Sequence, residues 1–421
     1  MGFQQGLSGL NAASKSLDVI GHNIANANTF GNKASRAEFG DMYANALGGG
    51  GGANNIGIGV NVQAVAQQFT QGNITTTQNP MDLAINGGGF FQVTDGKNPV
   101  MYSRNGQFKV DREGYIINNK RQQLLGYPAN GQGVVQPGVA TALKLPTGGI
   151  NPQVTTKVSI EANLDARLAV TAPASGPQIN FSDPKTYNNA TSMTAYDAKG
   201  QEIAVTYYFQ KAGTDSWNVF ATANGSTLAG TAAAPTPITT VNFPPNGSAP
   251  TAPAAPFAIN IPSATNINGA QTMAVPGVML DVKGMTQYGS GFTVSNVQQD
   301  GYSAGQLSSI TIEGNGIVLA RYSNGQSKPA GQIELATFRN PQGLQPLGDN
   351  VWGRTFASGD PTVSTPGVGN YGSLQSGALE ESNVDLTGEL VGMIVAQRVY
   401  QANAQTVKTQ DSVLQTLVSM R

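Results

Sequence analysis

The chain has 421 residues, of which 11% are charged, with 23 Lys plus Arg against 24 Asp plus Glu and a net charge of −1. Globular proteins average about 25% charged residues, and a nearly neutral chain lacks the clustered Lys and Arg that nucleic acids and acidic lipids require. With no cysteine and one histidine, the composition also excludes disulfides, thiolate nucleophiles and Cys-rich or His-rich metal sites, so we expect no cofactor, no metal and no nucleic-acid partner.

The first residues carry no familiar targeting signal. Residues 1–8 lack the basic and apolar regions of a secretory signal peptide, and Gly6 stands where a myristoylation motif needs Ser or Thr. No stretch reaches the roughly 18 apolar residues that cross a bilayer. These features alone predict a cytosolic protein that is not inserted in a membrane.

Near the N-terminus, residues recur at alternating spacings of four and three, which is typical of one face of an amphipathic helix. The single histidine, His22, lies in this segment, where a solvated or hydrogen-bonded structural role is favoured over a catalytic triad. The pattern weakens toward its end, and its members are Phe3, Leu7, Leu10, Ser14, Leu17, Gly21, Ile24 and Asn28.

A glycine-rich stretch follows this helix. The run Gly48–Gly52 with Gly57-Ile58-Gly59 has the glycines of a phosphate-binding loop but not its Gly-Lys-Ser/Thr ending, so we interpret it as a flexible linker. Residues 54–72 alternate weakly. They form either an extended arm or strand, or a plain connecting loop, and the sequence favours neither.

Residues 81–128 predict a meander of β-hairpins, because short apolar runs are separated by the turn signals Asp95-Gly96, Asn105-Gly106 and Glu113-Gly114. Gly87–Gly89 is interpreted as a tight turn or bulge that enters a strand.

Carboxylates in this region could form an acid–base pair. Asp82, Asp95 and Asp111 all lie beside predicted turns, however, and hairpin chemistry alone predicts acidic residues there. We therefore expect no catalytic residue among them.

Residues 154–299 contain further strand-like runs, such as Ile203–Phe209 and Trp217–Ala221. Eight of the 23 prolines fall between Pro235 and Pro262, which predicts a long exposed loop that joins no β-ladder.

The C-terminal segment predicts a second amphipathic helix, which needs a packing partner to be stable in water. Ser382 and Asp385 have the spacing of a capping box at its start. The two terminal helices either pair within one chain, in antiparallel or parallel fashion, or pack against other copies. The regular positions are Leu386, Leu390, Met393, Gln397, Tyr400, Ala404, Val407, Asp411, Leu414 and Val418.

Both terminal segments resemble the signatures of the bacterial flagellar rod, hook and hook-associated axial protein family. At the N-terminus the resemblance covers Leu7–Ala13 and Leu17–Thr29, followed by Gly31 and Lys33. At the other end it covers Ser382–Leu386, Glu389–Gln405 and Lys408–Arg421, and the last of these is most similar to the hook members of the family.

The resemblance extends into the middle of the chain. Residues 81–128 are similar to the body shared by rod and hook proteins, through Met81–Ile85, Gly89–Phe91, Tyr102–Phe108 and Leu125–Tyr127. Residues 301–375 match more loosely, and residues 154–299 match mainly by position and composition.

The resemblance implies a multidomain α+β fold with paired, coiled-coil-like terminal helices and β-rich middle domains formed by hairpins or β-barrel-like folds. It predicts a helical domain (1–30 with 384–421), a linking region or extended arm (31–80 with 376–383), an inner β domain (81–153 with 300–375) and an inserted outer β domain (154–299).

By the same resemblance, the chain is not an enzyme. It is expected to leave the cell through the flagellar type III export channel without a cleaved signal peptide, and to assemble in the extracellular flagellar hook as a curved tube. This tube would act as a universal joint that carries torque from rod to filament. Expected partners are further copies of the chain, the hook cap protein, the distal rod protein, the hook–filament junction protein and the export apparatus.

Two alternatives stay open: a distal-rod or hook-associated junction protein of the same family, and, more remotely, a β-domain carbohydrate-active enzyme. In the favoured interpretation the helix stripes pack between subunits, and the polar positions Gln397 and Asp411 fix their register. The residues expected in this intersubunit packing are Phe3, Leu7, Leu10, Leu17, Ile24, Leu386, Leu390, Met393, Tyr400, Ala404, Val407, Leu414 and Val418.

Overall fold

The computed structural model describes residues 2–42, 57, 59–173, 179–266 and 269–419. These residues form two compact units. Unit 1 falls within residues 1–147, 309–321 and 327–421, and unit 2 within residues 148–308 and 322–326. The predicted linker Gly48–Gly52 and residue Ile58 lie outside the described residues.

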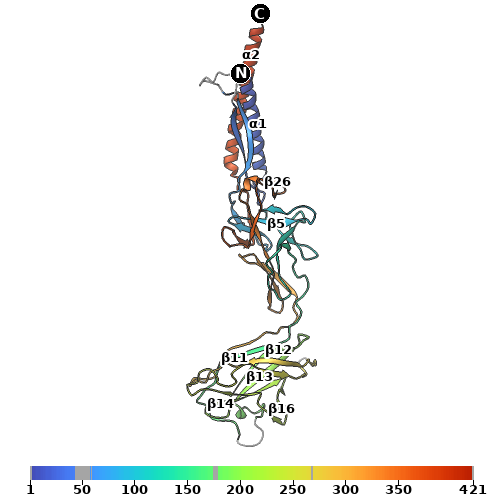
Figure 1. The fold of residues 1–421 in the computed structure, drawn as a ribbon, viewed down its shortest axis with the longest axis vertical. Coiled ribbons are helices and arrows are strands. Elements are labelled where there is room, and N and C mark those ends of the chain that lie inside the picture. Colours follow the sequence, from blue (N-terminus) through green and yellow to red (C-terminus); the bar gives the residue numbers. More distant parts are fainter. Residues whose placement is uncertain (1, 43–56, 58, 174–178, 267–268, 420–421) are drawn as a thin grey trace. The chain divides into compact units, whose positions relative to one another are not determined.

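The two long helices among the described residues are the predicted terminal ones, α1 (Gly2–Ala25) and α2 (Leu386–Ser419), both in unit 1. They run antiparallel: Gly6 of α1 lies against Val407 of α2, and Ile20 lies against Gly392. Figure 1 shows α1, in blue, beside α2, in red. The fold therefore contains the paired terminal helices that the sequence predicted.

A long β-hairpin accompanies α1. β1 (Ser35–Met42) pairs antiparallel with β2 (Gly59–Gln67), with a bulge between Glu38 and Phe39. Val60 N donates to Ser8 Oγ at 3.3 Å, which holds β2 beside α1. Of the two possibilities for residues 54–72, the structure thus shows a strand over 59–67.

The β part of unit 1 is centred on a 13-stranded sheet in the described part of the chain. Its apolar cores include Leu83, Phe91 and Ile333, and next to them a cluster of aromatic side chains with Phe90 and Trp352. Gly87 and Gly89 have φ angles of 117° and 121° where the chain enters β5, so the predicted turn is confirmed. The sheet consists of β5 (Phe90–Thr94), β6 (Met101–Ser103), β7 (Lys109–Val110), β8 (Ile116–Ile117), β9 (Gln123–Pro128), β10 (Thr141–Ala142), β22 (Leu307–Ile312), β23 (Ile317–Tyr322), β24 (Ser327–Ile333), β25 (Leu335–Thr337), β26 (Gln345–Gly348), β27 (Val351–Gly353) and β28 (Thr362–Ser364).

Two short ladders connect this β part to the chain that leads into the helices. β3 (Ile74–Thr76) pairs with β30 (Ala378–Glu380), and β4 (Leu83–Asn86) pairs with β29 (Ser373–Ser376), both antiparallel. Segments that follow α1 and precede α2 are thereby hydrogen-bonded to each other. A short 3-10 helix, η2 (Pro341–Gly343), precedes β26.

Unit 2 contains two main sheets that share one apolar core. Val158 and Ile160 of one sheet belong to the same cluster as Tyr207 and Trp217 of the other. One sheet has the order β19-β20-β11-β21, formed by β11 (Lys157–Asn163), β19 (Phe257–Ile261), β20 (Val275–Asp281) and β21 (Thr293–Gln299). The other consists of β12 (Asn189–Tyr196), β13 (Glu202–Lys211), β14 (Ser216–Ala223), β15 (Ser226–Thr227) and β18 (Thr239–Asn242), and unit 2 also holds β16 (Gly230–Thr231), β17 (Ala234–Pro235) and η1 (Pro184–Thr186).

The proline-rich stretch of unit 2 was wrongly predicted as a long exposed loop without a ladder. β18 pairs with β14 and β19 pairs with β20, and both strands bury apolar side chains, among them Val241 and Ile259. The prolines fall between these strands or at strand ends, where no ladder hydrogen bond is lost. Proline content therefore marked the connections, and the short proline-free runs between them form strands.

Candidate functional site

The seam between α1 and α2 contains several small and polar residues beside the apolar side chains of Ile20 and Val407. A Cβ on Gly6 would lie 2.8 Å from Val407 Cγ2, and a Cβ on Gly9 would lie 2.7 Å from Asn403 Oδ1. Ala13, at the same three-and-four spacing as these glycines, is buried. The absence of Cβ atoms at Gly6 and Gly9 therefore leaves room for the Val407 and Asn403 side chains of α2 against the backbone of α1.

The predicted stripes lie mostly outside this seam. Gln397 and Asp411, the register candidates, are exposed on α2, and Asp411 Oδ2 accepts from Gln415 Nε2 within the same helix. Val407 meets the seam, at Gly6. Leu10, Leu17, Ile24, Met393 and Ala404 are partly buried, whereas Phe3, Leu7, Leu386, Leu390, Tyr400, Leu414 and Val418 are 40% to 77% exposed.

A second exposed apolar row on α2 was missed by the sequence analysis. Val391, Val395 and Val399 follow one another at spacings of four and are 46% to 57% exposed. At about 100° per residue, this row and the Leu386–Leu390 stripe lie on opposite sides of the seam. The spacing of four between these valines is a signal for the row. The sequence analysis followed only the more regular stripe that begins at Leu386.

The cap of α2 differs in part from the predicted capping box. Asp385 precedes the first helical residue, and its Oδ1 accepts from Thr387 N at 3.0 Å. Ser382 does not cap the helix, because its Oγ accepts from Val384 N, outside the helix, at 3.4 Å. The next residue, Asn383, is bonded through its side chain to two other segments, at Ala34 and at Gln68–Thr70.

Two asparagines connect the helices to the β1–β2 hairpin. Asn23 Nδ2 donates to Ser35 O at 2.8 Å and to Glu389 Oε1 at 2.7 Å, and its Oδ1 accepts from Ser35 N at 2.8 Å. Asn383 Oδ1 accepts from Ala34 N at 2.7 Å, and its Nδ2 donates to Gln68 O at 2.7 Å. These side chains hydrogen-bond the start of α2, the end of α1 and both ends of the hairpin to one another.

Close to these asparagines, the buried ion triad Lys33, Glu380 and Arg104 joins three segments that are distant in the sequence. Lys33 Nζ lies 2.6 Å from Glu380 Oε1, and Arg104 Nη1 lies 3.2 Å from Glu380 Oε2. Lys33 also donates to Thr70 O at 2.8 Å, and Arg104 Nη2 to Gly87 O at 2.9 Å. Burial lowers the pKa of Lys33 and of Arg104, while the Glu380 carboxylate opposes both shifts.

The sequence marked most of these residues without showing what they contact. Asn23, Lys33, Arg104 and Asn383 all lie in stretches that carry the family resemblance. Glu380 lies outside them, in a short apolar run, and no sequence signal singled it out. Their convergence depends on the β3–β30 and β4–β29 ladders, which bring the ends of the chain together.

The carboxylates considered for catalysis bond to their own turns, as predicted. Asp82 Oδ2 accepts from Thr77 Oγ1 at 2.8 Å, and Asp111 Oδ1 accepts from Tyr115 N at 2.7 Å. The backbone N–H of Asn98 lowers the pKa of Asp95. Burial raises the pKa of Glu334, but this carboxyl is enclosed in the sheet and accepts from Gln92 Nε2 at 2.7 Å.

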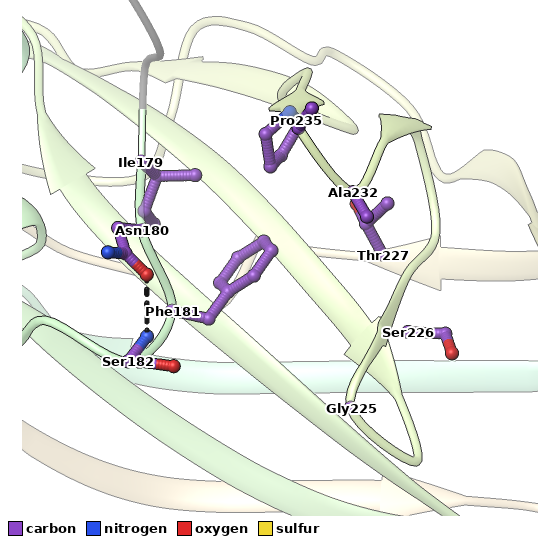
Figure 2. Close-up of a pocket in the computed structure, with 10 residues that line it drawn as sticks. Ile179, Asn180, Phe181, Ser182, Gly225, Ser226, Thr227, Ala232 and Pro235 are labelled. Atoms are coloured by element: carbon purple, nitrogen blue, oxygen red, sulfur yellow. Dashed lines mark hydrogen bonds between the residues drawn. The ribbon is translucent and has the colours of Figure 1, made fainter.

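Two pockets of unit 2 differ in their charged groups. One, of about 500 Å³, is lined by Lys157, Asp281 and Asp300, and Asp300 Oδ1 accepts from the backbone N–H groups of Thr156 and Lys157. Figure 2 shows a pocket of about 730 Å³ in unit 2, where Phe181 points toward Thr227 and Pro235. Its lining among the described residues contains no titratable side chain. Within the described parts of the chain there is also no group of three His, Cys, Asp or Glu side chains placed to hold a metal ion.

His22 is exposed, and its Nδ1 lies 3.3 Å from the Asn26 side-chain amide, as expected for a hydrogen-bonded structural histidine. No helix in the described residues is long and apolar enough to span a membrane.

Comparison with known families gives four matches along the chain. They are described as "Flagella basal body rod protein" for residues 3–33, "Flagellar hook protein FlgE/F/G D1 domain" for 84–163, "Flagellar basal body protein FlaE D2 domain" for 163–302 and "Flagellar basal body rod FlgEFG protein C-terminal" for 375–420.

Similar proteins match over the full length. The chain is 42% identical to the flagellar hook protein FlgE of Salmonella typhimurium and 41% identical to that of Escherichia coli, in both cases over 100% of each chain. It is 31% identical to FlgE of Borreliella burgdorferi, over 99% of this chain and 98% of the other. The crystal structure of Helicobacter pylori FlgE2 has a similar fold, with a TM-score of 0.54 and 13% identity over 73% of this chain and 100% of the other.

Proposed function

The chain belongs to the flagellar hook protein family and is a structural subunit of the bacterial flagellar hook, and on this basis we propose how its copies assemble. Copies pack side by side through the exposed apolar rows of α1 and α2. The product is a curved tube that acts as a universal joint and transmits torque from rod to filament.

The observation that carries this proposal is the exposure of large apolar side chains on both sides of the α1–α2 seam. One row holds Leu386 and Leu390, and the other holds Val391 and Val395. Burying one such side chain stabilises by about 1.5 to 3 kcal/mol, so copies that cover both rows gain considerable free energy. A subunit of a tube has a neighbour on each side, which two flanking rows suit.

The polar positions within the first row have a separate role in this proposal. Gln397 and Asp411 are exposed among apolar neighbours on α2. A polar residue in an apolar seam disfavours registers in which it meets an apolar partner. These two residues therefore fix the register between copies.

The remaining assignments extend the proposal. The helix pair forms one domain, residues 31–80 with 376–383 link it to an inner β domain (81–153 with 300–375), and residues 154–299 form an outer domain. The exported, extracellular chain meets the hook cap, the distal rod, the hook–filament junction protein and the export apparatus, and it has no catalytic role. The full-length similarity to structural hook proteins supports these assignments.

The test is polymerisation of the purified full-length chain, observed by electron microscopy. We expect curved tubes from the unmodified chain and none after removal of residues 1–25, because α2 then loses the partner of its seam. Leu390→Asp and Leu414→Asp should also prevent tubes, since each places a charge in a packed apolar surface.

Gln405→Asp is the matched control. Gln405 lies on the exposed face of α2, about 200° around the helix from Asn403 of the seam, and the substitution adds the same charge. It should leave the tubes intact. Straight rods from the unmodified chain, or tubes of normal length from Leu390→Asp, would contradict the proposal.

A further inference from the structure

A phenylalanine at the edge of unit 1 is fully exposed. Phe356 has a relative exposure of 104% in the turn that follows β27. Leu347 of the edge strand β26 is 52% exposed and lies against Gly353, at the end of β27 from which this turn starts. Leu347 and Arg354 line a groove of about 700 Å³ together with Val100, Met101 and Tyr102. We call Phe356, Leu347 and this groove the edge patch.

The turn that carries Phe356 is held by hydrogen bonds on both sides of it. Thr355 Oγ1 donates to Gly343 O at 2.5 Å, and Ser358 Oγ donates to Thr355 O at 2.9 Å. Asn340 Nδ2 donates to Ala357 O at 3.0 Å. The turn also packs on η2, where a Cβ on Gly343 would lie 2.5 Å from Ser358 N. The backbone of this turn is therefore held in place, and the Phe356 side chain projects from it into solvent.

The charges beside the ring are already paired. Arg354 forms an ion pair with Asp360 across the turn. The edge patch thus has no free charge at its centre that would select an oppositely charged partner, and its chemistry favours an apolar contact. A phenylalanine side chain is suited to this, because it has a large apolar area and only two rotatable χ angles to order when it is covered.

We propose that Phe356 is an anchor residue of a contact between neighbouring subunits. The contact is made by the inner β domain, which contains Phe356, and its partner is a second copy of this chain. The inference rests on the proposed polymerisation. In a polymer of identical subunits, assembly buries part of the surface of each subunit, and most of that surface is buried against other copies of the same chain. Helical polymers use heterologous contacts, so the surface that receives the ring differs from the edge patch itself.

Photo-crosslinking tests the identity of the partner. p-Benzoylphenylalanine is placed at position 356 of the full-length chain, and the assembled polymer is irradiated. We expect a covalent product of two copies, formed in the polymer and not in the unassembled chain, with the linked residue outside the edge patch. A polymer that yields no product between copies would overturn the proposal.

A second measurement gives the strength of the contact. Phe356→Ala should raise the critical concentration for polymerisation roughly ten- to thirtyfold, as loss of an anchor side chain does, while Phe356→Tyr should keep it near the value of the unmodified chain. Val139→Ala is the control, because Val139 is also exposed in unit 1 but lies outside the edge patch.

The outcomes separate this inference from the proposed function. An unmodified chain that forms no polymer contradicts the proposed function. A chain that polymerises normally with Phe356→Ala, or whose critical concentration rises equally with Val139→Ala, contradicts the role of Phe356 alone. Folding of each variant is checked by its thermal unfolding, which a fully exposed side chain should not change.

Discussion

At the scale of single residues, Glu380 neutralises two buried cations that come from distant parts of the chain. Its side chain and that of Lys33 are 0% exposed, and that of Arg104 is 5% exposed. Burying a charge is costly unless a partner and hydrogen bonds compensate. Removing the shared carboxylate would leave both cations buried without a counter-charge.

Glu380→Gln should therefore destabilise the chain by about 3 to 5 kcal/mol, although the side chain keeps its size. The free energy of unfolding is measured by urea titration of the purified full-length chain. Lys33 and Arg104 already have lowered pKa values because of burial, so neither can stay charged there cheaply without Glu380.

The neighbouring residue gives the control. Glu381 Oε2 accepts from Asn73 Nδ2 at 3.3 Å in an exposed contact. Glu381→Gln should change the free energy of unfolding by less than about 1 kcal/mol. Equal losses in the two variants would show that the triad has no special role.

At the scale of elements, different faces of α2 have different roles: one face packs against α1 within the chain, and the faces beside it expose large apolar side chains. Within the chain, the seam uses glycine and alanine for close packing and the Asn23–Glu389 hydrogen bond, whereas most of the large apolar side chains of α2 remain exposed beside it. Because most of these side chains are not buried within the chain, the helix pair is expected among the less stable parts of the single chain.

Gly9→Leu tests the seam. A Cβ at Gly9 would lie 2.7 Å from Asn403 Oδ1 and 2.9 Å from Asn403 Cγ, so the larger side chain should push α1 away from α2. We expect a loss of helical signal in far-ultraviolet circular dichroism of the full-length chain.

Gly21→Leu is the matched control in the same helix, because a Cβ there meets nothing within 4 Å. Replacing glycine by a good helix former at such a position should stabilise the helix by roughly 0.5 to 1 kcal/mol. If Gly21→Leu reduced the helical signal as much as Gly9→Leu, helix pairing through the glycines would be wrong.

At the scale of the whole molecule, each unit has apolar cores of its own. Trp217 and Tyr207 belong to the core of unit 2, and Phe91 and Ile333 belong to a core of unit 1. Among the described residues, none of the core clusters draws on both units. The two units should therefore unfold separately.

Calorimetry of the full-length chain should show two thermal transitions. Trp217→Ala should lower one transition and Phe91→Ala the other, each by a loss of about 3 to 5 kcal/mol in the affected unit. Each variant is the control for the other. If there were a single transition and both substitutions lowered its midpoint temperature, the two units would not unfold independently. That result would also contradict the predicted boundary between the inner and outer β domains.

Several features of the fold were predictable from local sequence. The three-and-four spacing from Phe3 and from Leu386 predicted both terminal helices, and the Asp95-Gly96 and Glu113-Gly114 signals predicted the β5–β6 and β7–β8 hairpins. The Asn105-Gly106 signal was wrong, because β6 and β7 on either side of it do not pair with each other. Local rules were less reliable for the proline-rich stretch, because strands as short as β18 owe their stability to the neighbouring strand rather than to their own residues.

The sequence by itself determined that the ends of this chain are helices with apolar faces, and the terminal signatures indicated the flagellar hook family. Helical periodicity follows from 3.6 residues per turn and needs no knowledge of the partner. Only the tertiary structure decided which face each helix uses within the chain. That choice depends on Gly6 and Gly9, where the absence of a Cβ leaves room for the side chains of Val407 and Asn403. Only the tertiary structure also shows that Glu380 meets Lys33 and Arg104, because long-range β pairing brings these parts of the chain together.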